Sequence, residues 1–262
     1  MPYWYRRVFV LAIPLILSNL TQPLLSTVDT ILSGHLPGPA ALGGVALGGI
    51  FFNAIFWTFG FLRMATTGLV AQSHGAEDAD EVRNHFSRAL VTAILIGAVI
   101  LLVQKPLIAV ALDLLGATPE VRANALVYCT IRIWSAPASL ANYTILGYLL
   151  GRQRARSALA LQAVINLVNV AVALYLVMGR HWGIAGIATA TLSAEWTGCL
   201  IGMAIVTFAG FNLAQALHAQ HWPAILHRES LKRLFALNRD ILLRTLSLVA
   251  AYAIFARTGA RA

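Results

Sequence analysis

The sequence predicts an all-α integral membrane protein: a six-helix transmembrane bundle followed by the start of a seventh helix. Three observations support this fold class. Of the 262 residues, 59% are hydrophobic and 11% are charged, and the mean hydropathy is +0.75. Long apolar runs recur six times, and the charged residues gather between them. A water-soluble domain normally has roughly a quarter of its residues charged, so soluble enzyme classes do not fit this composition.

A helix needs about 20 apolar residues to cross the hydrocarbon core of a bilayer. The chain therefore divides into three parts: a six-helix lobe (1–210), a cytoplasmic linker (211–239) and a partial seventh helix (240–262). Apolar residues within 226–235 recur at near-helical spacing opposite charges, which fits either an interfacial helix or a solvated connector. The six expected spans are residues 8–34, 40–64, 88–115, 123–150, 157–179 and 183–210.

The distribution of Lys and Arg predicts the orientation. If the N-terminus is cytoplasmic, eleven basic residues fall in cytoplasmic segments and three on the other side, as the positive-inside rule requires. The first apolar run continues to Gly34 without a cleavage site, so we expect it to be retained. We therefore expect a multi-pass protein of the plasma (bacterial inner) membrane, in which the net charge of +9 comes mostly from the cytoplasmic segments. No nucleic-acid partner is expected. The eleven are Arg6, Arg7, Arg83, Arg88, Arg152, Arg154, Arg156, Arg228, Lys232, Arg233 and Arg239; the three are Lys105, Arg122 and Arg180.

The cysteines and histidines predict no metal site, cofactor or enzyme chemistry. Cys129 and Cys199 lie inside apolar stretches, without a disulfide framework or a zinc-ligand spacing. The seven histidines lie at segment ends or in polar stretches. A membrane-embedded enzyme would need His, Ser or paired carboxylates at matched depth, and no histidine is expected there.

Away from the span ends, the ionisable residues expected at membrane depth are Asp29, Arg63, Arg132 and Glu195. Each costs about 2.5–3.5 kcal/mol on insertion scales, so each is a functional candidate. Asp29 and Glu195 are the candidates for binding a coupling proton or cation. Two alternatives stay open: that Asp29 extends outward to the interface, and that Glu195 forms a structural ion pair with Arg63 or Arg132.

Polar residues in the first span step by three or four positions, so they share one helical face. Such a face must meet other helices or a water-filled cavity. Two prolines in the same span each remove an internal hydrogen bond, which predisposes the helix to bend. The polar face comprises Ser18, Gln22, Ser26, Asp29 and Ser33, and the prolines, expected to act as a hinge, are Pro14 and Pro23.

The fifth and sixth spans carry a similar pattern. Asn166 and Asn169, together with Gln162, lie on one face of the fifth span, and Thr191 and Glu195 are i,i+4 neighbours on the sixth. The amides could line a substrate cavity or simply hold helices together. In the second span, the spacing of Gly44 and Gly48 favours close helix packing.

Several strings in the chain resemble the multidrug and toxic compound extrusion (MATE) family, in particular its DinF-like branch. The resemblance runs from about residue 8 to the end of the chain, and the motifs occur in the family's order. It is carried by the Asn166/Asn169 pair and by residues 12–14 (AIP), 24–30 (LLSTVDT), 61–69 (FLRMATTGL), 71–75 (AQSHG), 135–142 (SAPASLAN), 194–195 (AE) and 237–240 (LNRD).

The resemblance implies a transporter of two six-helix lobes, of which this chain matches the first, the connection between lobes and part of the seventh helix. In similar proteins a proton-titrating Asp in a bent first helix corresponds to Asp29. Polar residues on helices five and six correspond to Asn166, Asn169 and Thr191. Where many relatives have an acidic residue on helix five, four positions after the Asn, this chain has Ala173.

We therefore expect proton- or sodium-coupled antiport that exports cationic or amphipathic small molecules. Gln22, Ser26, Asn166, Asn169 and Thr191 would line the cavity together with the aromatic candidates Phe51, Phe52, Trp57 and Trp134. Membrane lipid would surround the chain, and its partner would be a missing C-terminal lobe or a second copy. One alternative is an inactive fragment of such a transporter. Another is a lipid-linked precursor flippase, which would need several basic residues in its cavity to bind phosphates, whereas this chain has only Arg63 and Arg132 as candidates.

Overall fold

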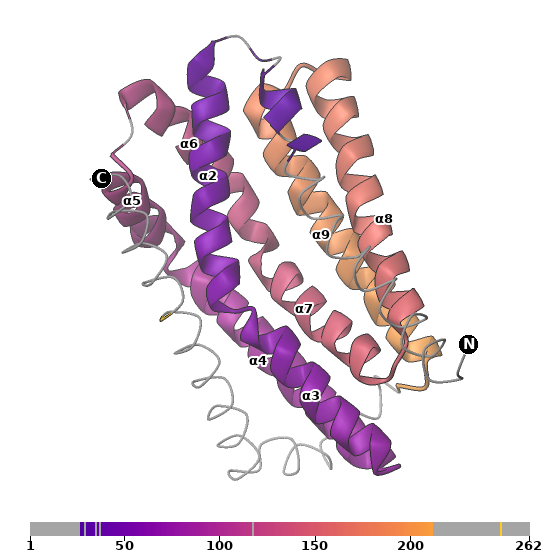
Figure 1. The fold of residues 1–262 in the computed structure, drawn as a ribbon. Coiled ribbons are helices and arrows are strands. Elements are labelled where there is room, and N and C mark those ends of the chain that lie inside the picture. The colour runs from indigo at the N-terminus through magenta and orange to yellow at the C-terminus, as the bar shows by residue number, and fades with distance from the viewer. Residues whose placement is uncertain are drawn as a thin grey trace, which may run out of the picture.

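A computed structural model describes residues 27–211 except 29, 35, 37 and 117, together with residue 247. Every regular element in this part is helical (Figure 1). Residues 27, 28 and 30–34 are also helical. The elements are α2 (Pro39–Thr58), α3 (Phe61–Gly75), α4 (Ala79–Leu102), α5 (Gln104–Leu114), α6 (Pro119–Arg132), the 3₁₀-helix η1 (Ile133–Ser135), α7 (Ala136–Gly151), α8 (Ala155–Leu174), the π-helix η2 (Tyr175–Gly179) and α9 (Gly183–Phe208).

Four helical segments in the described part are long and apolar enough to cross a membrane. They are Pro39–Gly75, Ala79–Leu102, Ala155–Gly179 and Gly183–Phe208. The series α6, η1 and α7 also runs from one end of the lobe to the other, with a bend at η1 (Figure 1). Pro137 lies in the first turn of α7, where its missing N–H costs least. The predicted all-helical membrane fold is confirmed, and the second, third, fifth and sixth expected spans correspond to the four segments above.

The predicted ends of two spans were wrong. The second span continues to Gly75 as α3, beyond the predicted end at residue 64, and the third begins at Ala79, before the predicted start at residue 88. The helices continue into polar sequence because backbone hydrogen bonding, not hydropathy, sets a helix end. At the start of α4, the Asp78 side chain accepts a hydrogen bond of 2.9 Å from the backbone N–H of Glu81. The predicted seventh helix and the linker lie outside the described residues, apart from Phe211 and residue 247.

The helices pack as neighbours around α7. α2 lies against α6, α3 and α4 lie against α7, and α8 lies against α9 (Figure 1). α7 also contacts α9, and 13 of the 16 residues of α7 are buried. A polar side chain on α7 therefore faces the interior of the lobe rather than lipid.

Small residues let these helices approach closely. The predicted contact through Gly44 and Gly48 is confirmed: a Cβ atom at either position would meet Asn124 or Tyr128 of α6 at 2.5 Å or less. On α7, a Cβ atom at Gly147 would lie 2.8 Å from the backbone oxygen of Arg63. Helix crossings that depend on glycine are typical of membrane proteins, where packing replaces the hydrophobic effect.

Candidate functional site

Several of the predicted site residues fall outside the part of the chain that the structure describes. These are Asp29, Gln22 and Ser26, with the predicted hinge residues Pro14 and Pro23. Their roles remain predictions. The described candidates are Asn166, Asn169, Thr191 and Glu195, and the structure places them on α8 and α9.

Asn169 and Thr191 form a buried polar pair between α8 and α9. The Asn169 side chain is 0% exposed and that of Thr191 is 3% exposed. The Nδ2 atom of Asn169 donates a hydrogen bond of 3.0 Å to the Thr191 hydroxyl. The Oδ1 atom of Asn169 is buried, without a hydrogen-bond partner among the described residues. An unsatisfied buried amide oxygen is costly unless a ligand or water binds it, so this pair can accept a donor or a cation.

The backbone next to this pair is irregular. Ala173, one turn beyond Asn169, is fully buried, and the π-helix η2 begins at Tyr175. A π-helical turn leaves the ordinary hydrogen-bond ladder and often occurs near functional sites. Ala173 thus places a methyl group, packed in the core, one turn beyond Asn169.

Asn166 has a different environment from Asn169, although both lie on α8. It is partly exposed, and its Oδ1 atom accepts a hydrogen bond of 3.3 Å from Nε2 of Gln162. Of the predicted amide stripe, Asn169 thus makes the direct contact with α9. Asn166 lies at the edge of the packed interface, where it is accessible from outside.

Glu195 lies one turn from Thr191 on α9 but contacts a different helix. Its Oε2 atom accepts a hydrogen bond of 2.8 Å from Nδ2 of Asn142, on α7. The same nitrogen donates a second bond of 3.0 Å to the backbone oxygen of Glu195. α9 therefore makes two polar contacts one helical turn apart: Thr191 bonds to α8, and Glu195 bonds to α7.

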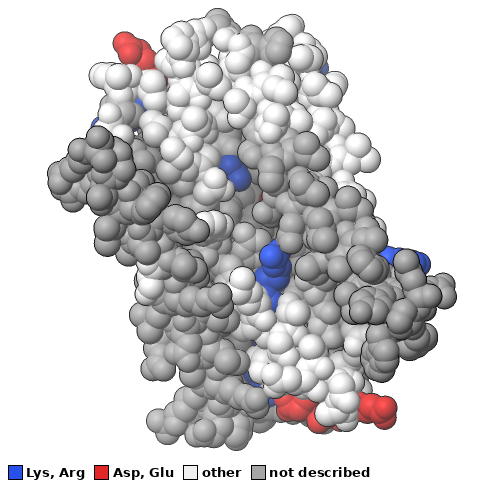
Figure 2. Space-filling view, in the orientation of Figure 1, with Lys and Arg blue, Asp and Glu red and all other residues white. Residues whose placement is uncertain are grey.

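The predicted alternative, an ion pair of Glu195 with an arginine, is not the contact that forms. Arg132 lies near enough for an electrostatic interaction with Glu195, but its guanidinium lies 4.6 Å from the centre of the Phe52 ring and donates to the Tyr128 hydroxyl. Arg63, Arg132 and Glu195 all lie within electrostatic range of Tyr143. The space-filling view shows basic groups in a hollow at the centre of this face, whereas acidic groups stand out at its two extremes (Figure 2).

Two of the predicted aromatic wall residues lie elsewhere. Phe51 and Phe52 are buried in the core, at 5% and 1% exposure, so their assignment to a cavity wall was wrong. Phe52 packs against Tyr128, which the absence of a side chain at Gly48 allows to approach α2. Trp57 and Trp134 are more than half exposed and remain available to a solute or to lipid.

Asn142 and Ser139 were not among the predicted site residues, although both lie in the 135–142 motif. Their spacing could have revealed them, because Ser135, Ser139 and Asn142 step by four and three positions and so share a face of the fourth span. The contact with Glu195 could not be predicted, since the two residues are 53 positions apart.

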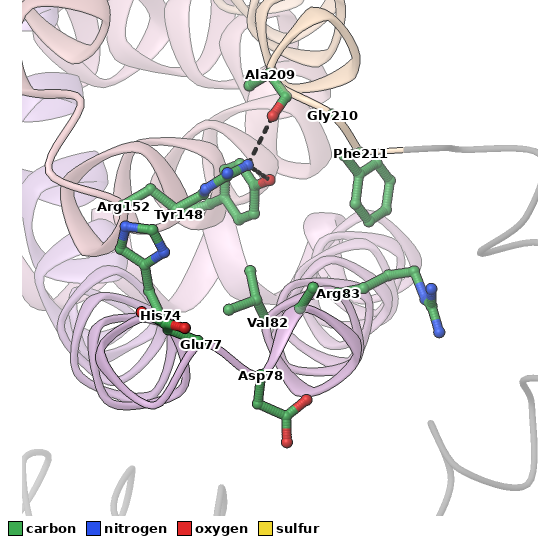
Figure 3. Close-up of a pocket in the computed structure, with 11 residues that line it drawn as sticks. His74, Glu77, Asp78, Val82, Arg83, Tyr148, Arg152, Ala209, Gly210 and Phe211 are labelled. Carbon is green, nitrogen blue, oxygen red and sulfur yellow. Dashed lines mark hydrogen bonds between the residues drawn. The ribbon is translucent and has the colours of Figure 1, made fainter.

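A separate pocket of about 340 Å³ lies at the end of the lobe where α3 meets α4 (Figure 3). Arg152 crosses it, donating hydrogen bonds of 2.7 Å to the backbone oxygen of Ala209 and 2.8 Å to the Tyr148 hydroxyl. Phe211 packs against Phe86 and Tyr148. These contacts fix the end of α9, and none of the predicted site residues lines this pocket.

Comparison with known proteins identifies the relatives of the chain. The family model described as MatE matches residues 14–175. The DNA damage-inducible protein F of Escherichia coli (strain K12) is 41% identical over 258 residues, which are 96% of this chain and 54% of that protein. The multidrug resistance protein MdtK of Pectobacterium atrosepticum is 27% identical over 96% of this chain and 55% of its own length. The chain thus spans about half the length of the curated relatives it matches.

Solved structures share the fold. A multidrug resistance MATE family transporter of the MOP superfamily, in an outward-facing conformation, matches with a TM-score of 0.81 at 22% identity. The match covers 94% of this chain and 54% of that one. At this identity the similarity shows the fold alone, which agrees with a multi-pass membrane protein built from apolar helices.

Proposed function

Because the chain belongs to the MatE family, we propose that it is the N-terminal lobe of a secondary active transporter. This transporter exports cationic or amphipathic small molecules by proton- or sodium-coupled antiport. The observation that carries the proposal is the Asn169–Thr191 pair, whose buried amide oxygen lacks a partner among the described residues. A packed membrane helix that retains such an oxygen offers a binding position for a proton donor or a cation.

In the proposed mechanism, Asp29 is the carboxyl that takes up and releases the coupling ion, and Glu195 is a second candidate for this role. Neutralising Asp29 removes a charge from the polar face of the first helix, so the segment containing Pro14 and Pro23 can change its bend and release the solute. One charge moving down about 100 mV supplies about 2.3 kcal/mol, and each unit of pH difference adds about 1.4 kcal/mol. Together these supply about 3.7 kcal/mol, enough to drive an uncharged solute uphill by between two and three orders of magnitude.

The test of coupling replaces Asp29 with Asn, which keeps the shape of the side chain but cannot titrate. Asp29→Asn should abolish pH-driven efflux of a cationic dye while leaving membrane insertion unchanged, in whichever form supports export: this chain or a longer protein that contains it. Glu195→Gln should have a smaller effect. Dye efflux from everted vesicles, energised by a pH gradient, measures both.

The matched control is Asp113→Asn on α5. Asp113 is an exposed carboxyl paired with Arg122 at 2.7 Å, away from the α8–α9 pair, so its loss should leave efflux unchanged. Coupled efflux by the Asp29→Asn variant at the rate of the unsubstituted protein would exclude the role proposed for Asp29.

We also propose that the protein lies in the bacterial inner membrane with its N-terminus in the cytoplasm. The turn between α3 and α4 should then be cytoplasmic and the turn between α5 and α6 external. After replacement of Cys129 and Cys199, a single cysteine at Thr118 should react with a membrane-impermeant maleimide in intact cells, and one at Ala76 should react only after lysis. The reverse pattern would invert the topology.

A further inference from the structure

A polar site lies between α7 and α9, at a different level from the Asn169–Thr191 pair. We call it the α7–α9 site; it consists of Glu195, Asn142 and Ser139. Asn142 and Ser139 are 3% and 4% exposed. Asn142 donates through Nδ2 to the carboxyl of Glu195 at 2.8 Å, while Ser139 also lies close to that carboxyl. The Oδ1 atom of Asn142 and the hydroxyl of Ser139 are buried, without a hydrogen-bond partner in the described part of the chain.

Buried acceptor positions at this site outnumber the donors, which are the Asn142 amide and the Ser139 hydroxyl. An ionised carboxylate is an acceptor only and has about four lone-pair positions, of which the Asn142 amide occupies one. The Oδ1 atom of Asn142 is a further acceptor that is buried and unsatisfied. A protonated carboxyl adds one O–H donor, which the amide oxygen can accept after the amide turns over, or which the Ser139 hydroxyl can accept directly. Adding one proton therefore supplies one more donor to a site in which acceptors are in excess.

The site lies at a different depth in the lobe from Ala173, the position one turn beyond Asn169. On α8, Ala173 is one turn from Asn169 toward the end of the lobe that holds the η2–α9 turn. On α9, Glu195 is one turn from Thr191 in the opposite direction. The two positions thus differ by about two helical turns, roughly 11 Å along the lobe. Glu195 supplies a carboxyl to the interior of the lobe, but on the side nearer to the α7–α8 turn.

The charged and titratable groups around the site come from four helices. Arg132 of α6 acts electrostatically on Glu195, and so does Glu195 on Tyr143 of α7 and on Cys199 of α9. Arg63 of α3 lies within electrostatic range of Tyr143. A negative Glu195 is therefore balanced partly by Arg132, which forms no salt bridge with it, so the carboxyl can change charge without breaking an ion pair with that arginine.

We propose that the α7–α9 site is a second proton-binding site, in which Glu195 carries the proton. Asn142 is the positioning residue: its amide N–H donates to the ionised carboxyl, and its amide oxygen accepts from the protonated carboxyl. This proposal deepens the proposed function and rests on it, because proton binding here matters only if the chain takes part in ion-coupled export. The site acts separately from Asp29, so that one lobe holds two titrating carboxyls at two levels.

The test is chemical labelling of Glu195 by dicyclohexylcarbodiimide, an apolar reagent that reacts with protonated carboxyls inside membranes. The chain is labelled in membrane vesicles, and mass spectrometry of the peptide that contains Glu195 gives the labelling rate. The rate should fall at least about fivefold between pH 6 and pH 9. Glu195→Gln should abolish this label. Asn142→Leu should raise the rate at pH 8 at least about threefold, because the carboxylate loses the amide donor that stabilises its ionised form.

Controls separate this proposal from general effects. Asn53→Leu removes an exposed amide from α2 and should leave the labelling of Glu195 unchanged. If Asn142→Leu does not fold, Ser139→Ala provides the second variant and should alter the pH at which labelling is half-maximal. A labelling rate independent of pH, or unaffected by both variants, would overturn the proposal. Slower labelling in Na⁺ than in choline would overturn the assignment to a proton.

The same measurement distinguishes the site from the proposed function. In Asp29→Asn, Glu195 should keep its label, because the two carboxyls titrate separately. Loss of the Glu195 label in Asp29→Asn would refute a separate site. If efflux does not depend on Asp29 but Glu195 is labelled as predicted, the coupling role of Asp29 is refuted. The α7–α9 site is then still supported.

Discussion

The hydrogen bond from Asn169 to Thr191 joins α8 to α9 inside the lobe, so its removal tests the importance of a single polar contact. Thr191→Val keeps the shape of the side chain and leaves the Asn169 amide nitrogen buried without its acceptor. We expect the free energy of unfolding to fall by about 1–3 kcal/mol. Denaturant unfolding of the protein in detergent micelles, followed by circular dichroism, measures the change.

Thr189→Val is the matched control for this prediction. The Thr189 hydroxyl donates to the backbone oxygen of Ala185 in its own helix, at 2.7 Å, so its loss leaves no group of another helix unsatisfied. The two variants change the same atoms on the same helix, two residues apart. Equal losses of stability in both would mean that the interhelical bond contributes nothing beyond the substitution itself.

The site residues show what spacing can and cannot predict. Thr191 and Glu195 could be found because both are polar and share one face of a single apolar helix. Their partners could not be assigned, since the choice between Asn169, Asn142 and Arg132 depends on which helices are neighbours. Helix periodicity fixes a face within one helix but not the helix that this face meets.

At the scale of elements, the crossing of α3 and α7 depends on the absence of a side chain at Gly147. A Cβ atom there would lie 2.8 Å from both the Arg63 backbone oxygen and Cβ of Thr66. Gly147→Val should therefore separate the two helices and lower the free energy of unfolding by about 1–3 kcal/mol more than the same substitution at Gly49. Gly49 has no neighbour within 4 Å of the corresponding position, so Gly49→Val controls for the cost of valine in a helix.

Thermal unfolding in one detergent, monitored for both variants, compares these crossings directly. If Gly147→Val loses no more stability than Gly49→Val, the two helices can move apart to accept a side chain at their crossing. Such a result would also weaken the corresponding argument for Gly44 and Gly48.

The helices were the most predictable part of the fold, and their ends the least. A hydropathy count measures how much of a helix is apolar, so it finds the segments that cross the membrane. It stops at polar residues such as Arg63 and Arg88, whereas the helices containing them continue to Gly75 and begin at Ala79. The break at η1 and the π-helix η2 arise from local backbone geometry, which hydropathy does not measure.

At the scale of the whole molecule, the described lobe leaves much apolar surface uncovered. In the apolar windows of the four membrane-crossing segments, no more than 39% of the residues are buried within the lobe. Lipid satisfies exposed apolar side chains, but it does not satisfy charged ones. A charged side chain at membrane depth therefore needs a polar or aromatic partner, as Arg132 has in Tyr128 and Phe52, and Figure 2 shows basic groups at the centre of this face.

This requirement leads to a prediction for the 262-residue polypeptide by itself: it should not catalyse coupled efflux. Alternating access requires two halves that rock around a central site, and the relatives it matches are about twice its length. With lipid against the polar face of the lobe, each unsatisfied amide or carboxyl costs something like 1–3 kcal/mol. The isolated polypeptide should therefore be unstable or self-associate through that face.

Light scattering coupled to size-exclusion chromatography, and dye transport in proteoliposomes, check the two parts of this prediction. We expect a dimer or larger species in detergent, and no export of a cationic dye when the exterior is acidified. A monomer that exports the dye against its gradient would overturn the prediction, because one lobe would then form a complete pathway. In that case the central hollow would itself have to open alternately to both sides of the membrane.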